Sequence, residues 1–227
     1  MIIITGASGG IGKYLLMKYL NNNIEVVGLY NSTVPDNNYL DHYFKVDITN
    51  IKDIDIFIES IKDKLSNIVL VNCAGTNYNK FAHKADLIKW SYVINVNLIG
   101  TFNMIHRVLG KMRKDNYGRI INLSSIVAQT PTPGASAYAA SKAALWGLTR
   151  SIAVENGEKN ITINNLNLGY FNTGIINEVP PEYLKQIIEK IPTGQLGDPK
   201  VVYDAVEFLI NNEYINGTSI DINAGLF

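Results

Sequence analysis

The 227-residue chain has a single cysteine and no excess of charge of either sign, and both scarcities narrow what it can be. One cysteine excludes an intrachain disulfide, which fits a reducing compartment, and we expect a cytoplasmic protein. Twenty basic residues balance twenty acidic ones, which argues against a nucleic-acid partner because such proteins carry a local basic excess. No apolar run approaches the roughly 18 residues that span a bilayer, so no membrane partner is expected.

Targeting signals and domain linkers are scarce as well. The run Ile2–Ile4 directly after Met1 is too short for the apolar core of a signal peptide. The structured part is therefore expected to begin at residue 1. No linker rich in proline or serine divides the chain, and hydrophobic residues make up 47% of it. We expect one domain over residues 1–227 with a real apolar core.

What the sequence does contain is an alternation of short apolar runs and helical patterns. Apolar runs predict buried strands, and apolar residues three or four positions apart predict helices. This order is typical of a parallel sheet covered by helices on both faces. The expected strands are 2–5, 25–30, 43–46, 68–72, 119–123, 161–168 and 219–222, and the expected helices are 10–20, 50–65, one bent or two separate helices in 87–113, 137–155 and 200–210.

One irregular stretch with several prolines, residues 169–198, interrupts the alternation. In α/β folds such variable segments lie outside the carboxyl ends of the strands, where ligands bind. The stretch is therefore a candidate substrate loop. A surface excursion with a short helix at 182–190 is the equally weighted alternative.

The segment between the first strand and the first helix reads TGASGGIG. Its glycines let the backbone approach a pyrophosphate at a helix N-terminus, where free N–H groups and the helix dipole favour anions. In this strand–turn–helix context the motif predicts a dinucleotide site. A tight turn that only packs the helix on the strand is the alternative. The candidate cofactor contacts in the turn are Gly6, Ser8, Gly10, Ile11 and Gly12.

No acidic residue directly follows the second expected strand, which ends at Tyr30. In many dinucleotide sites an acid at this place bonds the ribose hydroxyls, and a carboxylate there would repel a 2′-phosphate. Asn31 and Ser32 stand here instead and can bond either group, and the nearest acid is Asp36. We therefore expect NADP(H) rather than NAD(H), although no arginine or lysine lies in the glycine turn or at this strand end.

Asp47 and Ile48 follow the third expected strand. Asp47 can accept a hydrogen bond from the adenine amino group while Ile48 packs on the ring. Alternatively, Asp47, Thr49 or Asn50 caps the next helix. The two interpretations are compatible.

Tyr138 and Lys142 lie four residues apart in a helical pattern and so share one helix face. A free phenol has a pKa near ~10, too high for a general base at neutral pH. A nearby lysine ammonium favours the phenolate and lowers that pKa. Tyr138 can then exchange a proton with an alcohol or carbonyl oxygen while hydride moves to or from a nicotinamide. A solvated surface pair is the alternative.

Two further polar residues accompany this pair. Ser125 closes an expected strand, where its hydroxyl can polarise a substrate oxygen; Ser124 competes for this role, and an ordinary turn serine is the alternative. Asn97 lies within a helical pattern, which asparagine slightly disfavours. It can hold a water that connects the lysine to solvent. Asn95 competes with it, and a buried structural asparagine is the alternative.

In their order along the chain, these motifs resemble the short-chain dehydrogenase/reductase family over essentially the whole sequence. The resemblance implies a Rossmann-type, doubly wound sheet of about seven strands and an NAD(P)-dependent oxidoreductase that acts on a carbonyl or secondary alcohol. It also implies a catalytic tetrad of Asn97, Ser125, Tyr138 and Lys142, with Tyr138 as general acid/base. The matching segments are TGASGGIG at 5–12, Asp47, VNCAG at 71–75, Asn97, Ser125 with YAASK at 138–142, LGYFNT at 168–173 and NGTSIDINAG at 216–225.

The family pattern implies further cofactor contacts, with the backbone of 169–173 meeting the carboxamide, and no metal site. These contacts are Asn72, Ala74, Gly75, Tyr138, Lys142 (on the nicotinamide ribose), Gly169, Phe171 and Thr173. Three features depart from the pattern. Cys73 replaces a usual asparagine, Leu168 replaces a proline that would have fixed φ, and the glycine turn lacks the basic residue of many NADP-preferring members.

Segments 194–197 and 215–217 are most similar to bacterial 3-oxoacyl-carrier-protein reductases. That likeness implies a substrate bound to a carrier protein and a basic surface near the active site to dock it. The candidates for that surface are Arg113, Lys114, Arg119 and Lys159, diluted by Asp115, Glu155 and Glu158.

Several alternatives stay open. A sugar, a polyol or another secondary alcohol is an alternative substrate. A dinucleotide-binding sensor without chemistry is an alternative class, because fold does not fix function. The family also implies a homotetramer or homodimer that uses the helices around 95–113 and 137–156.

Overall fold

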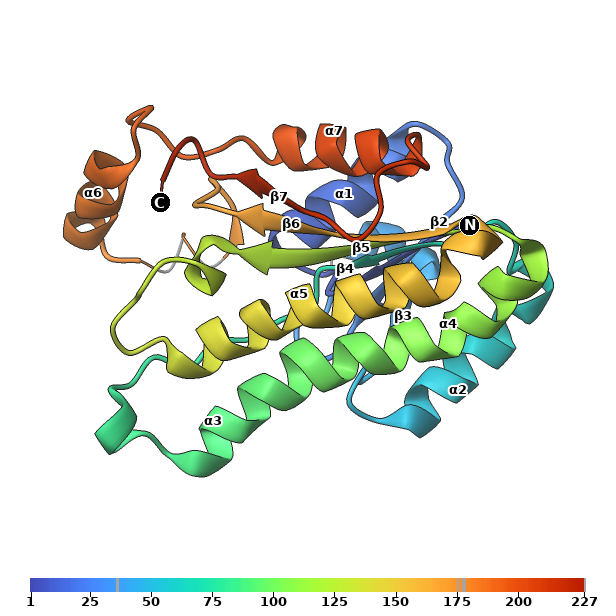
Figure 1. Ribbon diagram of the computed structural model, residues 1–227, viewed down its shortest axis with the longest axis horizontal. Helices are drawn as coiled ribbons and strands as arrows, with labels where there is room; N and C mark the ends of the chain where they lie inside the picture. The colour runs from blue at the N-terminus through green and yellow to red at the C-terminus, as the bar shows by residue number, and fades with distance from the viewer. Residues whose placement is uncertain (36, 175, 177–178, 227) are drawn as a thin grey trace.

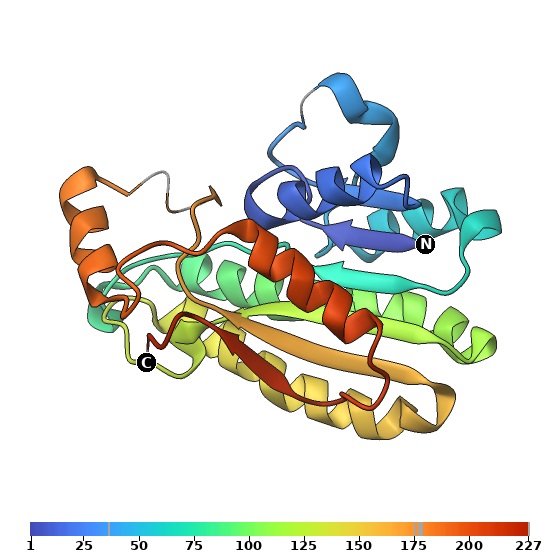
Figure 2. The ribbon, with the colours of Figure 1, turned by 90° about the horizontal axis from the view of Figure 1, so that it is seen from above.

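The computed structural model describes residues 1–35, 37–174, 176 and 179–226, and in these residues seven parallel strands form one sheet. The strand order is β3-β2-β1-β4-β5-β6-β7 (Figure 2), so the chain winds outward from β1 in both directions. This confirms the prediction of a Rossmann-type, doubly wound sheet of about seven strands. The strands are β1 (Ile2–Thr5), β2 (Val26–Tyr30), β3 (Tyr43–Lys45), β4 (Val69–Asn72), β5 (Gly118–Ser125), β6 (Ile161–Leu168) and β7 (Ser219–Ile222).

Helices cover both faces of this sheet. Figure 1 shows α1 (Gly10–Asn21) and α7 (Pro199–Ile210) on one face, with α2, α4 and α5 on the other. Most bounds lie within two residues of the predicted ones, while the helix expected at 50–65 is split into α2 and a short 3-10 turn. The remaining helices are α2 (Ile51–Ser60), α3 (Leu87–Ile94), α4 (Thr101–Asp115), α5 (Ser136–Asn156) and α6 (Pro181–Lys190), and the 3-10 turns are η1 (Asn37–His42), η2 (Lys62–Lys64), η3 (Ala82–Lys84), η5 (Ile126–Ala128) and η6 (Gly157–Lys159).

The long helical pattern at 87–113 is one bent helical run. A π-helical turn, η4 (Asn95–Gly100), joins α3 to α4 without a break. Such turns insert an extra residue into a helix and are frequent at functional sites. Here the turn brings Gly100 against Ile48, where an added Cβ would lie 2.7 Å from the Ile48 side chain.

The stretch at 169–198 contains the short helix foreseen in one of the two interpretations, as α6. The two ends of the excursion are paired, because Asn172 N donates to Gly197 O at 2.9 Å and Gly197 N donates to Tyr170 O at 2.9 Å. Every residue of α6 is at least partly exposed, and Figure 1 shows this helix beyond the carboxyl end of the sheet. Residues 175 and 177–178 of the expected substrate loop lie outside the described residues.

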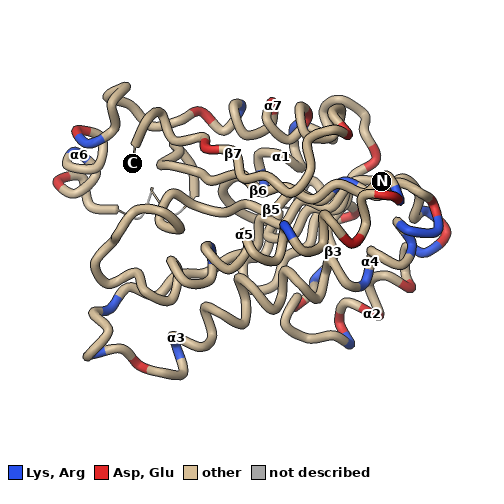
Figure 3. The backbone as a smooth tube through the Cα atoms, in the orientation of Figure 1, with Lys and Arg blue, Asp and Glu red and all other residues tan. Residues whose placement is uncertain are grey.

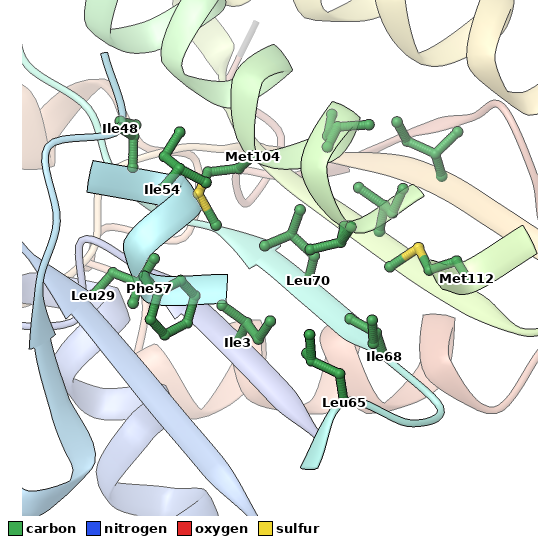
Figure 4. Close-up of a cluster of buried hydrophobic side chains, with 14 of the residues drawn as sticks. Ile3, Leu29, Ile48, Ile54, Phe57, Leu65, Ile68, Leu70, Met104 and Met112 are labelled. Atoms are coloured by element: carbon green, nitrogen blue, oxygen red, sulfur yellow. The ribbon is translucent and has the colours of Figure 1, made fainter. Parts of the chain in front are cut away.

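Apolar clusters fill the space between the sheet and the helices. One lies beneath α2, α4 and α5 (Figure 4) and includes Ile3, Leu70 and Met104, all fully buried. Another lies beneath α1 and α7 and includes Leu16 and Val206. Each such side chain contributes roughly 1.5–3 kcal/mol through burial. Among the described residues, no helix has the length and apolarity to cross a membrane.

Candidate active site

The predicted site residues gather at the carboxyl ends of the central strands. The glycine turn follows β1, the turn Cys73–Thr76 follows β4, and Ser125 closes β5. Helix α5 begins at the same edge and carries Tyr138 and Lys142 in its first two turns. In parallel α/β sheets this edge is where ligands bind.

Close packing accounts for two glycines of the TGASGGIG turn. Gly6 has a φ of +64°, and a Cβ there would lie 2.7 Å from the backbone of Ala74. A Cβ on Gly12 would lie 2.4 Å from Gly6 O. Both positions therefore exclude side chains because the turn touches its neighbours, as the packing interpretation expects.

The start of α1 supplies the feature that packing does not explain. Side chains of Asn50, Asp86 and Asp198 cap α2, α3 and α7, whereas no side chain of the described residues caps α1 at Gly9. The first N–H groups of α1 therefore lack the side-chain acceptor that α2, α3 and α7 have, and α5 and α6 lack one as well. An uncapped helix N-terminus fits the anionic pyrophosphate of a dinucleotide. Ser8 beside it is half-buried, and a phosphate contact stays its predicted role.

The adenosine end of the expected site is less enclosed. Asn31 and Ser32 are exposed directly after β2, and Asp36 lies outside the described residues. Asp47 Oδ1 accepts hydrogen bonds from the N–H and the hydroxyl of Thr49 at 2.9 and 2.7 Å. The cap of α2 is Asn50, which accepts from the N–H of its second residue. Asp47 therefore does not cap the helix, and an adenine contact stays its predicted role.

Ile48 is only 6% exposed and packs into the cluster of Figure 4. Its carbonyl accepts a hydrogen bond from Asn103 Nδ2 at 3.0 Å. The residue therefore belongs mainly to the core, and a contact with an adenine ring would use only its exposed edge.

The turn after β4 differs from the expectation in its first two residues. Asn72, the last residue of β4, donates from Nδ2 to Asn122 Oδ1 at 2.9 Å within the sheet, while its buried Oδ1 has no hydrogen-bond partner among the described residues. Burial raises the pKa of the Cys73 thiol to about 12, partly offset by the charge of Lys142, so the thiol is neutral at neutral pH. Ala74 N donates to Thr5 Oγ1 at 3.1 Å, which holds the turn against β1.

Asn97 clamps this turn from the π-helical segment. Its Oδ1 accepts from Thr76 N at 2.8 Å, and its Nδ2 donates to Thr76 O at 2.9 Å and to Ser141 Oγ at 3.0 Å. Asn97 is fully buried, while Asn95 is exposed. Both amide atoms of Asn97 bind protein groups, and its role in holding a water for a proton path stays a prediction.

The two neighbouring serines have different partners. Ser124 Oγ donates to the Lys142 carbonyl oxygen at 3.2 Å, a bond between strand and helix. Ser125 Oγ accepts from Val127 N at 3.4 Å and also hydrogen-bonds the Tyr138 hydroxyl. Only Ser125 therefore lies against the tyrosine, as the choice between the two serines anticipated.

The expectation that Lys142 lowers the pKa of Tyr138 is wrong for this structure, in which the Tyr138 hydroxyl is protonated at neutral pH. Burial raises the pKa of its hydroxyl, and the hydrogen bond with Ser125 lowers it in part. The expected decrease in this pKa was assigned to Lys142, whose Nζ lies 5.6 Å from the centre of the Tyr138 ring. The Ser125 hydroxyl is the group that lowers the pKa in this structure.

Lys142 is a buried cation with donors to spare. It is 5% exposed, and its Nζ donates to Leu123 O at 2.7 Å, its one hydrogen-bond acceptor among the described residues. Burial lowers the pKa of Lys142 to about 8. An added Cβ on Gly75 would lie 3.6 Å from Nζ, so glycine keeps this side of the ammonium open. The spare donors fit the hydroxyls of a ribose.

The segment after β6 approaches the site through its backbone. Gly169 N donates to Ile222 O at 2.9 Å, and a Cβ on Gly169 would lie 2.9 Å from Asn223 Cα. Phe171 is 7% exposed with its ring in the apolar cluster under α7, so its expected cofactor contact is left to its backbone. Thr173 is half-buried. Leu168, where the family has proline, is packed in the same cluster.

The four basic residues expected to form a docking surface do not lie near the candidate active site. Arg113 and Lys114 end α4, and Lys159 directly precedes β6, so all three lie at the amino edge of the sheet. Arg119 is 4% exposed and donates to Asn160 O at 2.8 Å. Figure 3 shows basic and acidic residues mixed at this end of the tube. The four residues lie far from Tyr138 because α4 and α5 run antiparallel to the strands.

The sequence interpretation also missed a row of buried amides. Asn72, Asn122, Asn165 and Ser219 stand in register on β4, β5, β6 and β7. Their side chains are joined by hydrogen bonds of 2.9, 3.2 and 3.0 Å. The available signal was asparagine within runs that are otherwise apolar. We call these four residues the amide row.

Comparisons with known proteins agree with this geometry. The short chain dehydrogenase family profile matches residues 1–184. A 3-oxoacyl-(acyl-carrier-protein) reductase of Vibrio cholerae is 31% identical over 99% of this chain and 96% of its own. An acetoacetyl-CoA reductase of Shinella zoogloeoides is 41% identical over 70% of this chain and 67% of its own. The solved aldohexose dehydrogenase of Thermoplasma acidophilum has a TM-score of 0.89 and 28% identity, covering 99% of this chain and 93% of its own.

Fold and site thus define a nicotinamide-dependent oxidoreductase that acts on CH–OH or C=O groups. The chain belongs to the short-chain dehydrogenase family.

Proposed function

We propose that this enzyme reduces the ketone of a 3-oxoacyl thioester to a secondary alcohol and uses NADPH as the reductant. The observation that carries the proposal is the hydrogen-bonded pair of hydroxyls on Ser125 and Tyr138 beside the buried Lys142. The thioester class is supported by two relatives whose names specify 3-oxoacyl and acetoacetyl thioesters.

The residues of the site divide the work of the reduction. Tyr138, protonated at neutral pH, donates its proton to the ketone oxygen. Ser125 donates a hydrogen bond to the same oxygen and stabilises the charge that develops there. Lys142 binds the ribose hydroxyls with its spare donors, and Asn97 positions the Gly75–Thr76 turn. The nicotinamide, when bound, supplies the hydride.

The preference for NADPH is supported by the end of β2. Asn31 and Ser32 are polar, exposed and uncharged, so they do not repel a 2′-phosphate and can donate hydrogen bonds to it. Catalytic efficiency with NADPH is expected to exceed that with NADH. A clear advantage for NADH would reverse this part of the proposal.

A substrate panel tests the reaction. Purified protein is mixed with NADPH and acetoacetyl-CoA, longer 3-oxoacyl-CoA thioesters or the same acyl groups on a carrier protein, and the nicotinamide absorbance is followed. We expect turnover of the thioesters. Oxidation of an aldohexose with NAD(P)⁺ is measured as the alternative reaction, because the structural neighbour is an aldohexose dehydrogenase. Sugar oxidation without thioester turnover would replace the proposed substrate class.

Assembly is part of the same proposal. We expect a homotetramer or homodimer, supported by exposed apolar side chains on α3, η4 and α4, among them Tyr92, Ile99 and Phe102. Native mass spectrometry measures the state directly, and a monomer at micromolar concentration would contradict it.

A further inference from the structure

The segment 126–135 links the two hydroxyls of the site. It begins after Ser125 and ends where α5 starts, three residues before Tyr138. It contains no charged residue. The segment connects Ser125 to the helix of Tyr138, and we call residues 126–135 the wall segment.

Hydrogen bonds hold this segment to other parts of the fold near both of its ends. Lys80 N donates to Gly134 O at 2.8 Å near the later end. At the earlier end Gln129 Nε2 donates to Asp221 Oδ1 on β7 at 2.6 Å. The second bond is charge-assisted, and such bonds are shorter and stronger than bonds between neutral groups.

Asp221 is held in turn by the catalytic helix. Asn167, in register with Asp221 on the neighbouring strand, donates from Nδ2 to the same Oδ1 at 2.8 Å. Asn167 Oδ1 accepts from Trp146 Nε1 at 3.1 Å, and Trp146 lies one turn beyond Lys142 on α5. Asn167 is 1% exposed. A continuous chain of hydrogen bonds therefore runs from α5 through β6 and β7 to Gln129.

We propose that Gln129 and Asp221 are positioning residues that fix the 126–135 wall and so determine which acyl chains fit beside Ser125 and Tyr138; this rests on the proposed function. Ser125 is held by β5 and Tyr138 by α5, so both keep their places when the wall loosens. Loss of the bond therefore weakens substrate binding more than it slows the reaction of bound substrate.

A donor–acceptor exchange tests this role. Gln129→Glu replaces the 2.6 Å bond with two facing carboxylates. Their repulsion pushes residues 126–135 away from β7. Adding Asp221→Asn restores the bond with its direction reversed. Both wild-type bonds end on one oxygen, Asp221 Oδ1. In the double variant the amide nitrogen at position 221 donates to the new carboxylate at position 129, and its oxygen accepts from Asn167 after the side chain turns about its last bond. Asp204→Asn, which removes an exposed aspartate paired with Lys200 on α7, is the matched control.

We expect Gln129→Glu to raise KM for a long 3-oxoacyl thioester about tenfold, a size typical of one charge-assisted bond. KM for NADPH and kcat are expected to change less than about threefold. The double variant is expected to return KM for the thioester to near its wild-type value. The control should match the wild type. An unchanged KM in Gln129→Glu, or a double variant as weak as the single one, overturns the proposal.

Hydrogen exchange separates this proposal from the proposed function. If the wild type reduces no thioester, the proposed function is wrong. Hydrogen exchange of the 126–135 amides still measures whether the Gln129–Asp221 bond holds this segment. Faster exchange in Gln129→Glu that the double variant reverses supports the positioning role. Equal exchange in all three proteins overturns it.

Discussion

The sheet face beneath α4 and α5 is apolar at one end and polar at the other. Towards the amino edge, Ile68, Leu70 and Ile120 pack against α4 in the cluster of Figure 4. Two residues further along the same strands, the side chains on this face are Asn72 and Asn122 of the amide row. Side-chain direction alternates along a strand, so both sets point to the same helix layer.

The two ends hold their helices by different means. Apolar contacts at the α4 end are strong in sum but tolerate small shifts, because they have no preferred direction. At the α5 end, Thr149 Oγ1 donates to Asn165 Oδ1 at 2.7 Å and accepts from Asn122 Nδ2 at 3.2 Å. Hydrogen bonds of this kind are directional, and a buried network penalises any shift that leaves a group unpaired. The helix that carries Tyr138 and Lys142 is thus the one held in register.

Tyr138→Phe is the change with the largest expected effect, and it acts on chemistry alone. Removal of the hydroxyl should lower kcat by about 10²–10⁴ through loss of the proton donor. The apolar end is untouched, so the free energy of unfolding should stay within about 1 kcal/mol. Stopped-flow turnover and urea unfolding measure the two. Tyr183→Phe on exposed α6 is the control, and retained turnover in Tyr138→Phe would refute the proton-transfer role.

Leu70→Ala tests the apolar end. The side chain is fully buried, so its truncation leaves a cavity and should cost about 2–5 kcal/mol of unfolding free energy. The folded fraction should keep near-normal kcat because α5 has its own contacts. Chemical denaturation measures the loss, with exposed Leu87→Ala as the control. A loss below about 1 kcal/mol would mean that this cluster does not carry the stability assigned to it.

Lys142 makes the polar end sensitive to pH. Burial lowers its pKa to about 8, so between about pH 8 and 10.5 the unfolded chain binds more protons than the folded one. Lys142 therefore makes stability rise with pH across this window, by at most roughly 3 kcal/mol, as the buried charge is relieved. The raised pKa of the Cys73 thiol acts in the opposite direction above about pH 9, so the Lys142 contribution is measured against a variant that lacks it.

Urea titrations of the cofactor-free protein at several pH values measure this slope. Lys142→Met should be more stable than the wild type below pH 8 and should lack the slope. A wild-type curve that is flat or falls between pH 8 and 10 relative to Lys142→Met would contradict the burial argument.

The amide row itself is tested by a change with a modest expected effect on both stability and turnover. Asn165→Leu with Thr149→Val removes both acceptors of the buried Asn122 Nδ2. A buried donor is then left unpaired, and we expect a loss of about 1–3 kcal/mol. Because α5 then loses its hydrogen bond to the amide row, kcat should fall about fivefold, more than the stability change implies. Turnover and denaturation on the same samples separate the two quantities, and normal kcat would show that the row is not needed for register.

Much of the fold follows from local pattern. The strands at 2–5, 161–168 and 219–222 match β1, β6 and β7 at both ends, because apolar residues recur in each of them between turn residues. The bend at Asn95–Gly100 was open in the sequence, since a helix and a π turn share nearly the same apolar spacing.

The site was predictable as far as its residues act through local position. Tyr138 and Lys142 share a helix face because of their spacing, and the glycine turn precedes a helix start in the sequence itself. The basic residues were misplaced because the position of a residue such as Arg113 depends on the direction of its helix relative to the strands. Sequence proximity to a motif says nothing about that direction.

The sequence by itself determined the order of strands and helices, the glycine turn and the residues able to exchange a proton with a substrate. Those features depend on interactions within a few residues. Only the tertiary structure decided that Ser125 rather than Ser124 meets Tyr138, that Asn97 binds the backbone of Thr76, and that the amide row forms at all. Its members lie dozens of residues apart, and the register of paired strands brings them together.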